Sequence, residues 1–352
     1  MMTRSDRSLS PATSYGVALR IAVLAVWACL VLAAAAHAQS KVGTTFGAFT
    51  LIEPDARFAA MGNAGSAGAE GLVGAYFNPG SVALLDKHAV EFVHVDWIAD
   101  IRYDWLGYSH PFGFGNIYAT FTSLNSGDIP VRTVAQPLGT GELFSVSDIA
   151  LGLGFAHKFS LRFAAALQIN YLQETIFHSS AGTATFTAGT LYRMSANGLR
   201  IGASLSNFGT HAAYSGDNLA ITYDNVPGQN GDNGALPGAR DTDPFAVPVA
   251  FRVGVAQPLV LGDGTKFLFS ADAIHPSDNT ESMSLGAEVT FRDALSVRGG
   301  WQGLFLQDTE VGLTAGAGFR GNIDDVKYHV DYAWADQGRL DSSQRFSFGI
   351  TF

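Results

Sequence analysis

The strongest constraint on the fold is a repeated alternation of apolar residues with small or polar ones. In one segment, apolar residues occupy every second position: Leu161, Phe163, Ala165, Leu167, Ile169 and Tyr171. Four more segments share this pattern: 199–206, 249–256, 282–291 and 311–320. Successive side chains of a β-strand point to opposite faces, so each segment has one apolar face and one small or polar face. The chain is therefore predicted to consist of amphipathic strands.

Strand length separates the two folds that such strands can form. A soluble β-sandwich shows the same alternation with its apolar face inward. The segments here run over about 9–14 residues, as tilted membrane strands do, whereas soluble strands average about 5–6. Their second face is made of Gly, Ala, Ser and Arg, which suits a crowded barrel lumen. We therefore predict an all-β protein, a transmembrane antiparallel β-barrel.

The pattern predicts about 14 strands, an even number as in bacterial barrels. They are expected at 88–96, 101–110, 115–124, 146–157, 160–174, 183–193, 197–208, 247–258, 265–275, 281–291, 294–303, 310–320, 325–336 and 344–352. Most even-numbered connections are short and turn-like. Both long gaps, 125–145 and 209–246, are odd-numbered, as expected for external loops when both termini are periplasmic.

Residues 1–38 are predicted to be a secretory signal peptide. Three arginines supply its positive start, an apolar run covers 21–36, and Ala36-His37-Ala38 gives a small-x-small cleavage pattern before Gln39. The alternative is a membrane anchor, but the run is short for a bilayer span. The protein is therefore expected in the outer membrane, with Gln39 as its first mature residue.

Composition excludes several classes of chemistry. The single cysteine, Cys29, lies in the signal region, so disulfides and thiol chemistry are not expected in the mature chain. Acidic residues exceed basic ones, 31 to 21, which argues against a nucleic-acid partner. No metal or phosphate-binding motif is present.

His275 near Asp278 is the best enzyme candidate, but no nucleophile motif accompanies it, so we expect no catalytic residues, metal or cofactor.

The last strand carries a second membrane signal. Phe346, Phe348, Ile350 and Phe352 alternate to the end of the sequence. We interpret them as the C-terminal assembly signal that barrels present to the barrel assembly machinery. The alternative is a soluble edge strand ending in Phe, but an exposed apolar edge promotes aggregation in water.

Residues 39–86 precede the barrel, predicted over 87–352, and their core, 43–85, does not alternate. An Ala- and Gly-rich stretch, 56–69, is consistent with a short helix and turn, and Asn78-Pro79-Gly80 then interrupts the chain. Because the segment is apolar, we predict a hatch inside the lumen; the alternative is a periplasmic tail.

These motifs resemble those of the PorV/PorQ family, which is itself similar to FadL-type fatty-acid transporters. Arg57 to Ala64 resembles the family's Ala- and Gly-rich opening, and Phe77-Asn78-Pro79-Gly80 matches its Asn-Pro-Ala hatch motif except at Gly80. Further matches lie at 137–141, 205–209 and 275–279. The resemblance implies a barrel of about 14 strands with a lumenal hatch. Some members belong to the type IX secretion system and hold exported cargo.

Two function classes remain open. The first is a secretion-associated surface scaffold that binds an exported cargo protein through its external loops. The second is a FadL-like channel for a hydrophobic solute; a purely structural envelope role is a third, weaker alternative. Either leading function implies outer-membrane lipid and the barrel assembly machinery as partners.

Charged residues on the polar faces are the remaining site candidates. The predicted lumen charges are Arg162, Arg200, Arg252, Asp272, Glu288, Arg298, Asp331 and Arg345. Because both signs are interleaved, we interpret them as an internal ion-pair network; the alternative is a permeation pathway. Five aromatic residues are expected to face outward as an interfacial girdle: Trp105, Trp301, Tyr328, Tyr332 and Trp334.

Overall fold

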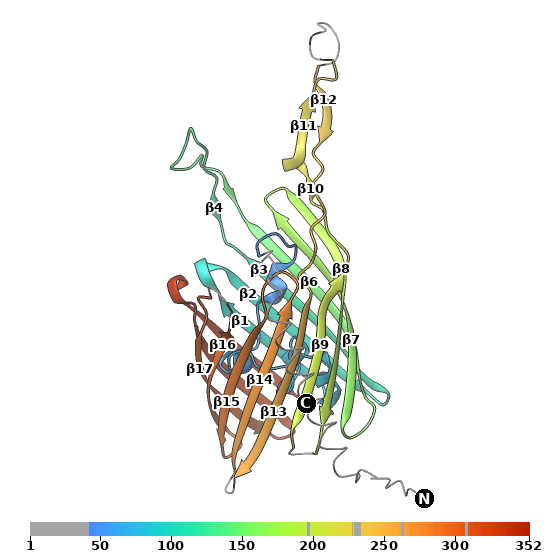
Figure 1. The fold of residues 1–352 in the computed structure, drawn as a ribbon, viewed down its shortest axis with the longest axis vertical. Helices are drawn as coiled ribbons and strands as arrows, with labels where there is room; N and C mark the ends of the chain where they lie inside the picture. The colour runs from blue at the N-terminus through green and yellow to red at the C-terminus, as the bar shows by residue number, and fades with distance from the viewer. Residues whose placement is uncertain (1–41, 196–197, 227, 229–233, 262–263, 307–308) are drawn as a thin grey trace, which may run out of the picture. The chain divides into compact units, whose positions relative to one another are not determined.

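The computed structural model describes residues 42–195, 198–226, 228, 234–261, 264–306 and 309–352. Fourteen long antiparallel strands form one closed barrel, which confirms the predicted fold class (Figure 1). The predicted signal peptide and Gln39 lie outside the described residues. Among the described residues, no helix is long and apolar enough to cross a membrane.

The barrel strands start and end within a few residues of the predicted positions. They are β1 (Ala89–Asp96), β2 (Arg102–Phe112), β3 (Gly115–Asn125), β6 (Val146–Lys158), β7 (Phe163–Ile176), β8 (Ser179–Arg193), β9 (Arg200–Gly209), β13 (Ala250–Leu261), β14 (Thr265–Pro276), β15 (Ser282–Phe291), β16 (Leu295–Leu304), β17 (Leu313–Ile323), β18 (Val326–Asp336) and β19 (Ser342–Thr351).

The barrel closes where the first strand meets the last. β1 pairs with β19 over its whole length, with Phe92 opposite Phe348. His88 and Phe352 then exchange two backbone hydrogen bonds of 3.1 and 3.0 Å. The C-terminal strand that the sequence marked as an assembly signal is thus half of the closing seam.

The two ends of the barrel differ in their connections. At the end near the C-terminus, called the turn end, short turns such as 113–114 and 324–325 join neighbouring strands. The opposite loop end carries both long connections. One forms the hairpin of β4 (Ile129–Pro130) and β5 (Leu143–Phe144). The other holds β10 (Ser215–Gly216), β11 (Ala220–Tyr223) and β12 (Leu236–Ala239), and the β11–β12 hairpin projects far beyond the barrel (Figure 1).

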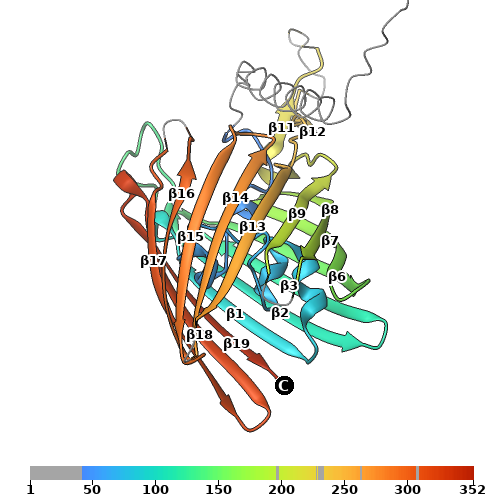
Figure 2. The same cartoon turned by 60° about the horizontal axis from the view of Figure 1, so that its bottom comes forward.

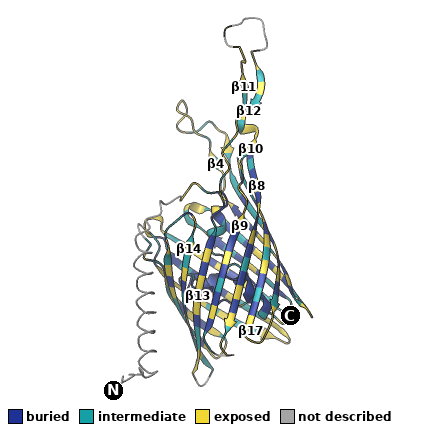
Figure 3. Ribbon diagram, turned by 45° about the vertical axis from the view of Figure 1, so that its right-hand side comes forward, coloured by how far each residue is buried: buried dark blue, intermediate teal, exposed yellow. Residues whose placement is uncertain are grey.

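Exposure alternates along the strands, as the sequence pattern requires. In β19, Phe346 and Phe348 are exposed at 46% and 47%, whereas Ser347 between them is buried at 3%. The same alternation of buried and exposed residues covers the visible wall in Figure 3. The apolar face therefore points outward and the small or polar face points into the lumen.

Trp105 faces the lumen, so the prediction that it belongs to the outward-facing aromatic girdle is wrong. It is buried at 4% and packs in the lumen with Tyr103, whereas Trp301 is 48% exposed on the outer surface. In β2, apolar residues occupy both faces, with Leu106 and Tyr108 turned outward. Alternation alone therefore did not reveal which face of this strand is the inner one.

The segment before β1 lies inside the barrel and is called the hatch, residues 42–86. It contains η1 (Ala48–Leu51), α2 (Ala56–Ala59), η2 (Val73–Ala75) and η3 (Pro79–Leu84). Figure 2, with the turn end turned toward the viewer, shows this blue segment enclosed by strands. The short helix and turn expected over 56–69 are present as the four residues of α2 and the turns that follow it.

Glycines on the inner wall allow the hatch backbone to approach closely. A Cβ atom on Gly202 would collide with the Ser66 carbonyl, and one on Gly286 would collide with Met61. A Cβ atom on Gly300 would collide with the hatch at Gly62. These small lumen residues therefore fit the hatch against the strands.

We predict that Phe348→Asp impairs insertion, because charged side chains on the lipid face destabilise a barrel, Arg or Lys by roughly 2–4 kcal/mol at mid-bilayer and Asp by less. Phe348→Leu keeps the face apolar and serves as the matched control. The measurement is the amount of heat-modifiable barrel in the membrane fraction. Equal amounts of both variants would contradict the prediction.

Candidate functional site: the hatch and the lumen

Asn78 joins two turns of the hatch to the barrel wall. Its side-chain oxygen accepts a hydrogen bond from the Gly80 amide at 3.0 Å, and its amide donates to Ser66 and Thr190 carbonyls at 2.9 and 2.8 Å. It caps η3, with Pro79 at the first helical position, a favourable combination for starting a helical turn. The predicted motif Asn78-Pro79-Gly80 thus lies against β8 and is fully buried.

A buried chain of ion pairs holds the hatch to the opposite wall. Arg57 of the hatch donates to both carboxylate oxygens of Glu288, at 2.9 and 2.7 Å. Glu288 also accepts from Arg298 at 2.5 Å, and Arg298 contacts Asp331 at 2.6 Å. All four side chains are buried, so this is an internal network, as the interleaved signs suggested.

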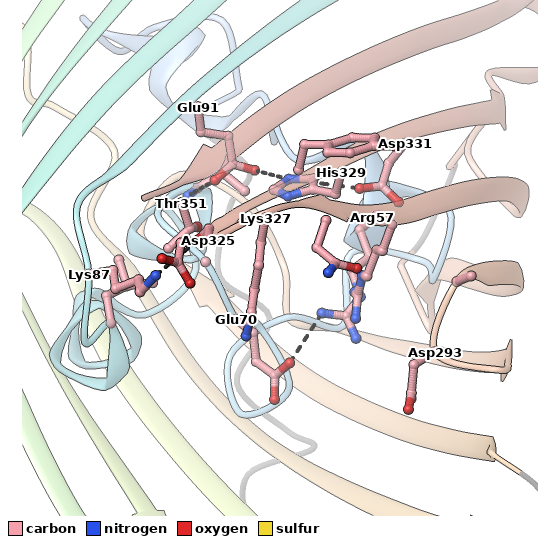
Figure 4. Close-up of a pocket in the computed structure, with 18 of the residues that line it drawn as sticks. Arg57, Glu70, Lys87, Glu91, Asp293, Asp325, Lys327, His329, Asp331 and Thr351 are labelled. Carbon is pink, nitrogen blue, oxygen red and sulfur yellow. Dashed lines mark hydrogen bonds and ion pairs between the residues drawn. The ribbon is translucent and has the colours of Figure 1, made fainter.

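Glu70 links the hatch to a further strand. It pairs with Arg200 of β9 at 2.6 Å and with Arg57 at 3.7 Å, as Figure 4 shows for Arg57. Desolvation in the lumen by itself raises the pKa of Glu70, whose side chain is 45% exposed, but the two arginines outweigh it and hold this pKa below its ordinary value. Glu70 is therefore a carboxylate shared between hatch and wall.

Glu91 also links the hatch to the barrel wall, at the closing seam between β1 and β19. It lies on β1 and accepts backbone hydrogen bonds from Leu72 and Val73 of the hatch at 3.1 and 2.9 Å. His329 of β18 contacts its other oxygen at 3.0 Å (Figure 4). One carboxylate therefore joins the hatch to strands on both sides of β19.

Below the hatch lies the turn-end vestibule, a cavity of about 680 Å³. Charges of both signs line it, among them Lys87, Lys266, Arg292, Arg320, Lys327, Asp293, Asp324 and Asp325. Several of these side chains are labelled in Figure 4. The vestibule is therefore highly charged, with both signs present.

Two smaller cavities lie between the hatch and the barrel wall. The middle cavity, about 70 Å³, has apolar and aromatic walls from Phe49, Tyr103, Trp105 and Leu172, with hydroxyl and amide groups opposite. The loop-end cavity, about 360 Å³, is lined by Leu51, Trp97, Ile274 and other residues. Arg252 lines both cavities, which places the two spaces side by side.

The start of the hatch contacts the base of the long loop. Glu174 of β7 accepts hydrogen bonds from the Gly47 amide at 2.6 Å and from the Tyr214 hydroxyl at 2.5 Å. The Phe46 amide donates to the Ala246 carbonyl at 2.9 Å. Loop and hatch thus meet at the loop end, a contact that no local pattern predicts.

The structure distributes the predicted lumen charges over several places. Glu288, Arg298 and Asp331 form the network, Arg200 pairs with Glu70, and Asp272 accepts the Ser66 amide at 2.7 Å. Arg252 and Arg345 lie at the loop-end cavity.

Arg162 differs from the prediction. It is exposed in the turn before β7, because β7 begins only at Phe163.

Sequence reasoning missed Arg57, Glu70 and Glu91 as hatch anchors. For Arg57 and Glu70, the available signal was a charged residue in or beside the Ala- and Gly-rich stretch, whereas Glu91 is a charge on the inner face of β1. The enzyme candidate His275 pairs with Glu281 at 2.9 Å, and both side chains are exposed. Among the described residues, no cluster of three or more His, Cys, Asp or Glu could hold a metal ion.

Comparison with known proteins supports the fold. No protein-family model matches the chain, and no curated protein matches it in sequence. It resembles the solved Pseudomonas putida toluene transporter TodX, with 12% identity, a TM-score of 0.53, and coverage of 85% of this chain and 98% of that chain. A deltaS2S3 mutant of the TodX monoaromatic hydrocarbon channel gives 11% identity and a TM-score of 0.55, covering 86% of this chain and 99% of that one.

The CymD monoaromatic hydrocarbon channel gives 12% identity and a TM-score of 0.52, covering 86% of this chain and 97% of that one. At such low identity these likenesses show a shared fold. None of the comparisons matches PorV/PorQ specifically, and that family assignment stays a prediction. The chain has the fold of outer-membrane hydrocarbon channels.

We predict that Glu288→Gln loosens the hatch. It leaves two buried arginines without this carboxylate, and breaking a buried pair typically costs roughly 3–5 kcal/mol. Ion conductance in planar bilayers should therefore rise, while heat-modifiable migration shows an intact barrel. Asp293→Asn breaks a half-exposed pair with Lys266 and should leave conductance unchanged. Unchanged conductance in Glu288→Gln would show that this network does not hold the hatch.

The stability of the docked hatch is expected to depend on pH through the protonation of Asp55. Burial, with Glu91 and Asp331 adding to it, raises the pKa of Asp55 from 3.8 to about 7. Between these values the docked hatch holds a proton that the undocked segment lacks, so its stability falls as pH rises through this window.

Conductance should therefore increase between about pH 4 and about pH 7. Asp55→Asn retains a side-chain oxygen that can accept from the Arg57 amide, so it should flatten the response. A steep pH response in that variant would exclude Asp55 as its cause.

Proposed function

We propose that this protein is an outer-membrane channel that admits small hydrophobic molecules past the hatch. The observation that carries this proposal is the middle cavity, whose walls include Phe49, Tyr103, Trp105 and Leu172. Aromatic and aliphatic walls with a few polar groups opposite are typical of sites for small organic molecules. At about 70 Å³ the cavity is smaller than the roughly 300–1,000 Å³ of such sites, so a solute enters it only when the hatch moves. The solved proteins of similar fold are named as hydrocarbon channels, which supports the same class.

The lumen is divided in a way that suits this function. Apolar buried residues gather on β1, β2, β3, β6 and β7 beside the hatch, whereas the ion-pair network lies on β15, β16 and β18. The ionic side fixes the hatch, and the apolar side offers a surface for a hydrophobic solute. Displacement of the hatch along this surface would join the two smaller cavities to the turn-end vestibule.

The surface-scaffold function remains a second candidate because of the long loop. The β11–β12 hairpin extends far from the barrel (Figure 1), and Tyr223 on it is 46% exposed. An exposed aromatic side chain on a projecting hairpin is a common feature of protein-binding surfaces. In this proposal the hairpin holds an exported protein, while the lumen serves only to anchor it.

One set of variants separates the two functions. Ala150→Phe fills the middle cavity from β6 and should lower uptake of radiolabelled toluene by intact cells about tenfold, a loss of roughly 1.4 kcal/mol. Ala317→Phe adds the same ring on the exposed outer wall and is the control. Replacing 217–240 with a Gly-Ser linker should leave uptake unchanged.

Normal toluene uptake in Ala150→Phe would contradict the channel proposal. Loss of a co-purifying exported protein from the linker variant, with uptake normal in both, would establish the scaffold instead. The barrel content of each membrane is measured in parallel.

A further inference from the structure

Two histidines face each other on the outer wall beside the closing seam. His88 directly precedes β1, and His110 lies near the end of β2. Because Ala89 is opposite Ser109 in the β1–β2 ladder, the next pair along the two strands is His88 and His110. Their ring centres are 4.5 Å apart. Two imidazoles thus meet across one pair of strands.

Strand pairing explains why the two rings come so close. The amide and the carbonyl of His88 both form hydrogen bonds with Phe352, the residue after β19. They therefore point away from β2, so His88 occupies a non-hydrogen-bonded position opposite His110. In such pairs the Cα atoms are only about 4.5 Å apart and the side chains lie closest. The backbone itself holds the two imidazoles together.

The partners of these two rings differ from those of other histidines in the chain. Three other histidines contact carboxylates: His94 with Asp104 at 2.7 Å, His275 with Glu281 at 2.9 Å and His329 with Glu91 at 3.0 Å. Within the described ranges, no Asp or Glu oxygen lies within the 4.0 Å ion-pair distance of His88 or His110. Their ring nitrogens can therefore serve another kind of partner.

Tyr108 orients one ring of the pair. Its hydroxyl lies 3.1 Å from Nδ1 of His88. When Nδ1 carries the proton and donates this hydrogen bond, Nε2 of the same ring keeps its lone pair. Metal-binding histidines usually have such a hydrogen bond on the nitrogen that does not contact the ion.

Aromatic neighbours confine the two imidazoles. The ring of His88 stacks on that of Phe352 with 5.4 Å between their centres, and the ring of His110 lies 4.1 Å from that of Phe112. Both histidines are half-buried, and they share the outward face with Tyr108 and Phe112, which are 44% and 43% exposed. The rings are thus held in place but can be reached from outside the barrel.

We propose that His88 and His110 together bind one divalent transition-metal ion of the class that prefers imidazole, such as Zn²⁺ or Cu²⁺. Zinc lies about 2.0–2.1 Å from a ligating nitrogen, so two nitrogens on one tetrahedral ion are about 3.3 Å apart. Two rings whose centres are 4.5 Å apart can provide this spacing. Imidazole suits zinc, copper and nickel, whereas calcium and magnesium prefer oxygen ligands.

Such an ion would tie β2 to β1 next to the seam with β19. The site lies on the outer wall, apart from the hatch and the lumen, so it does not depend on the proposed channel function.

The experiment titrates Zn²⁺ by calorimetry into the full barrel, purified in detergent without a histidine tag, with Ca²⁺ as the oxygen-preferring comparison. Zn²⁺ should bind and raise the Tm of the barrel, and Ca²⁺ should bind at least about tenfold more weakly at this site. His88→Phe and His110→Phe keep an aromatic ring at each position and should each weaken Zn²⁺ binding at least about tenfold.

His157→Phe is the matched control. His157 also stacks between phenylalanines at the turn end, with Phe155 and Phe159 at 6.3 and 4.6 Å, but Ala165 is its cross-strand partner on β7. Zn²⁺ affinity and the Tm rise should be unchanged in this variant.

Wild-type protein that binds no Zn²⁺, or binds Ca²⁺ equally well, overturns the inference. Zn²⁺ affinity and a Tm rise that persist in both His88→Phe and His110→Phe place the ion elsewhere and overturn it too. Heat-modifiable migration shows whether each variant is folded. If one variant fails to fold, the other decides, together with the wild-type preference for Zn²⁺ over Ca²⁺.

Discussion

Closure of the backbone hydrogen-bond ladder is the constraint on which the structure depends. In lipid, every backbone amide and carbonyl must find a partner within the protein, which a sheet achieves only by closing on itself. Here β1 and β19 complete the ladder, down to the two bonds between His88 and Phe352. A closed wall has one face toward the lipid and one toward the lumen. The apolar side chains of each strand therefore point outward.

A barrel of this size encloses more space than its own side chains fill, and the hatch occupies that space. Its backbone reaches the wall because glycines such as Gly202 and Gly286 leave room. It also carries its own charged anchors, of which Arg57 with Glu288 is the central pair. Packing and ion pairing thus act together, since close approach of the backbones brings these charges into contact.

The two ends of the lumen are chemically different. At the turn end, Glu70, Glu91 and Glu288 are satisfied by arginines, a histidine and backbone amides. At the loop end, Arg252 and Arg345 donate hydrogen bonds to hydroxyl and carbonyl groups. The ion pairs that hold the hatch thus gather toward the turn end of the lumen.

The sequence by itself determined the barrel class, the number of strands, their approximate limits and the end that carries long loops. All of these depend on period-two alternation and turn residues, which are local. It also placed Asn78-Pro79-Gly80 in a non-strand segment ahead of the barrel.

Only the tertiary structure decided which face of β2 is internal, because apolar residues occupy both faces there and place Trp105 inside. It also decided which charges meet: Arg57 and Glu288 are 231 residues apart, and Arg252 and Arg345 share one cavity from separate strands. Such contacts depend on strand register, closure and the path of the hatch, which no local pattern encodes.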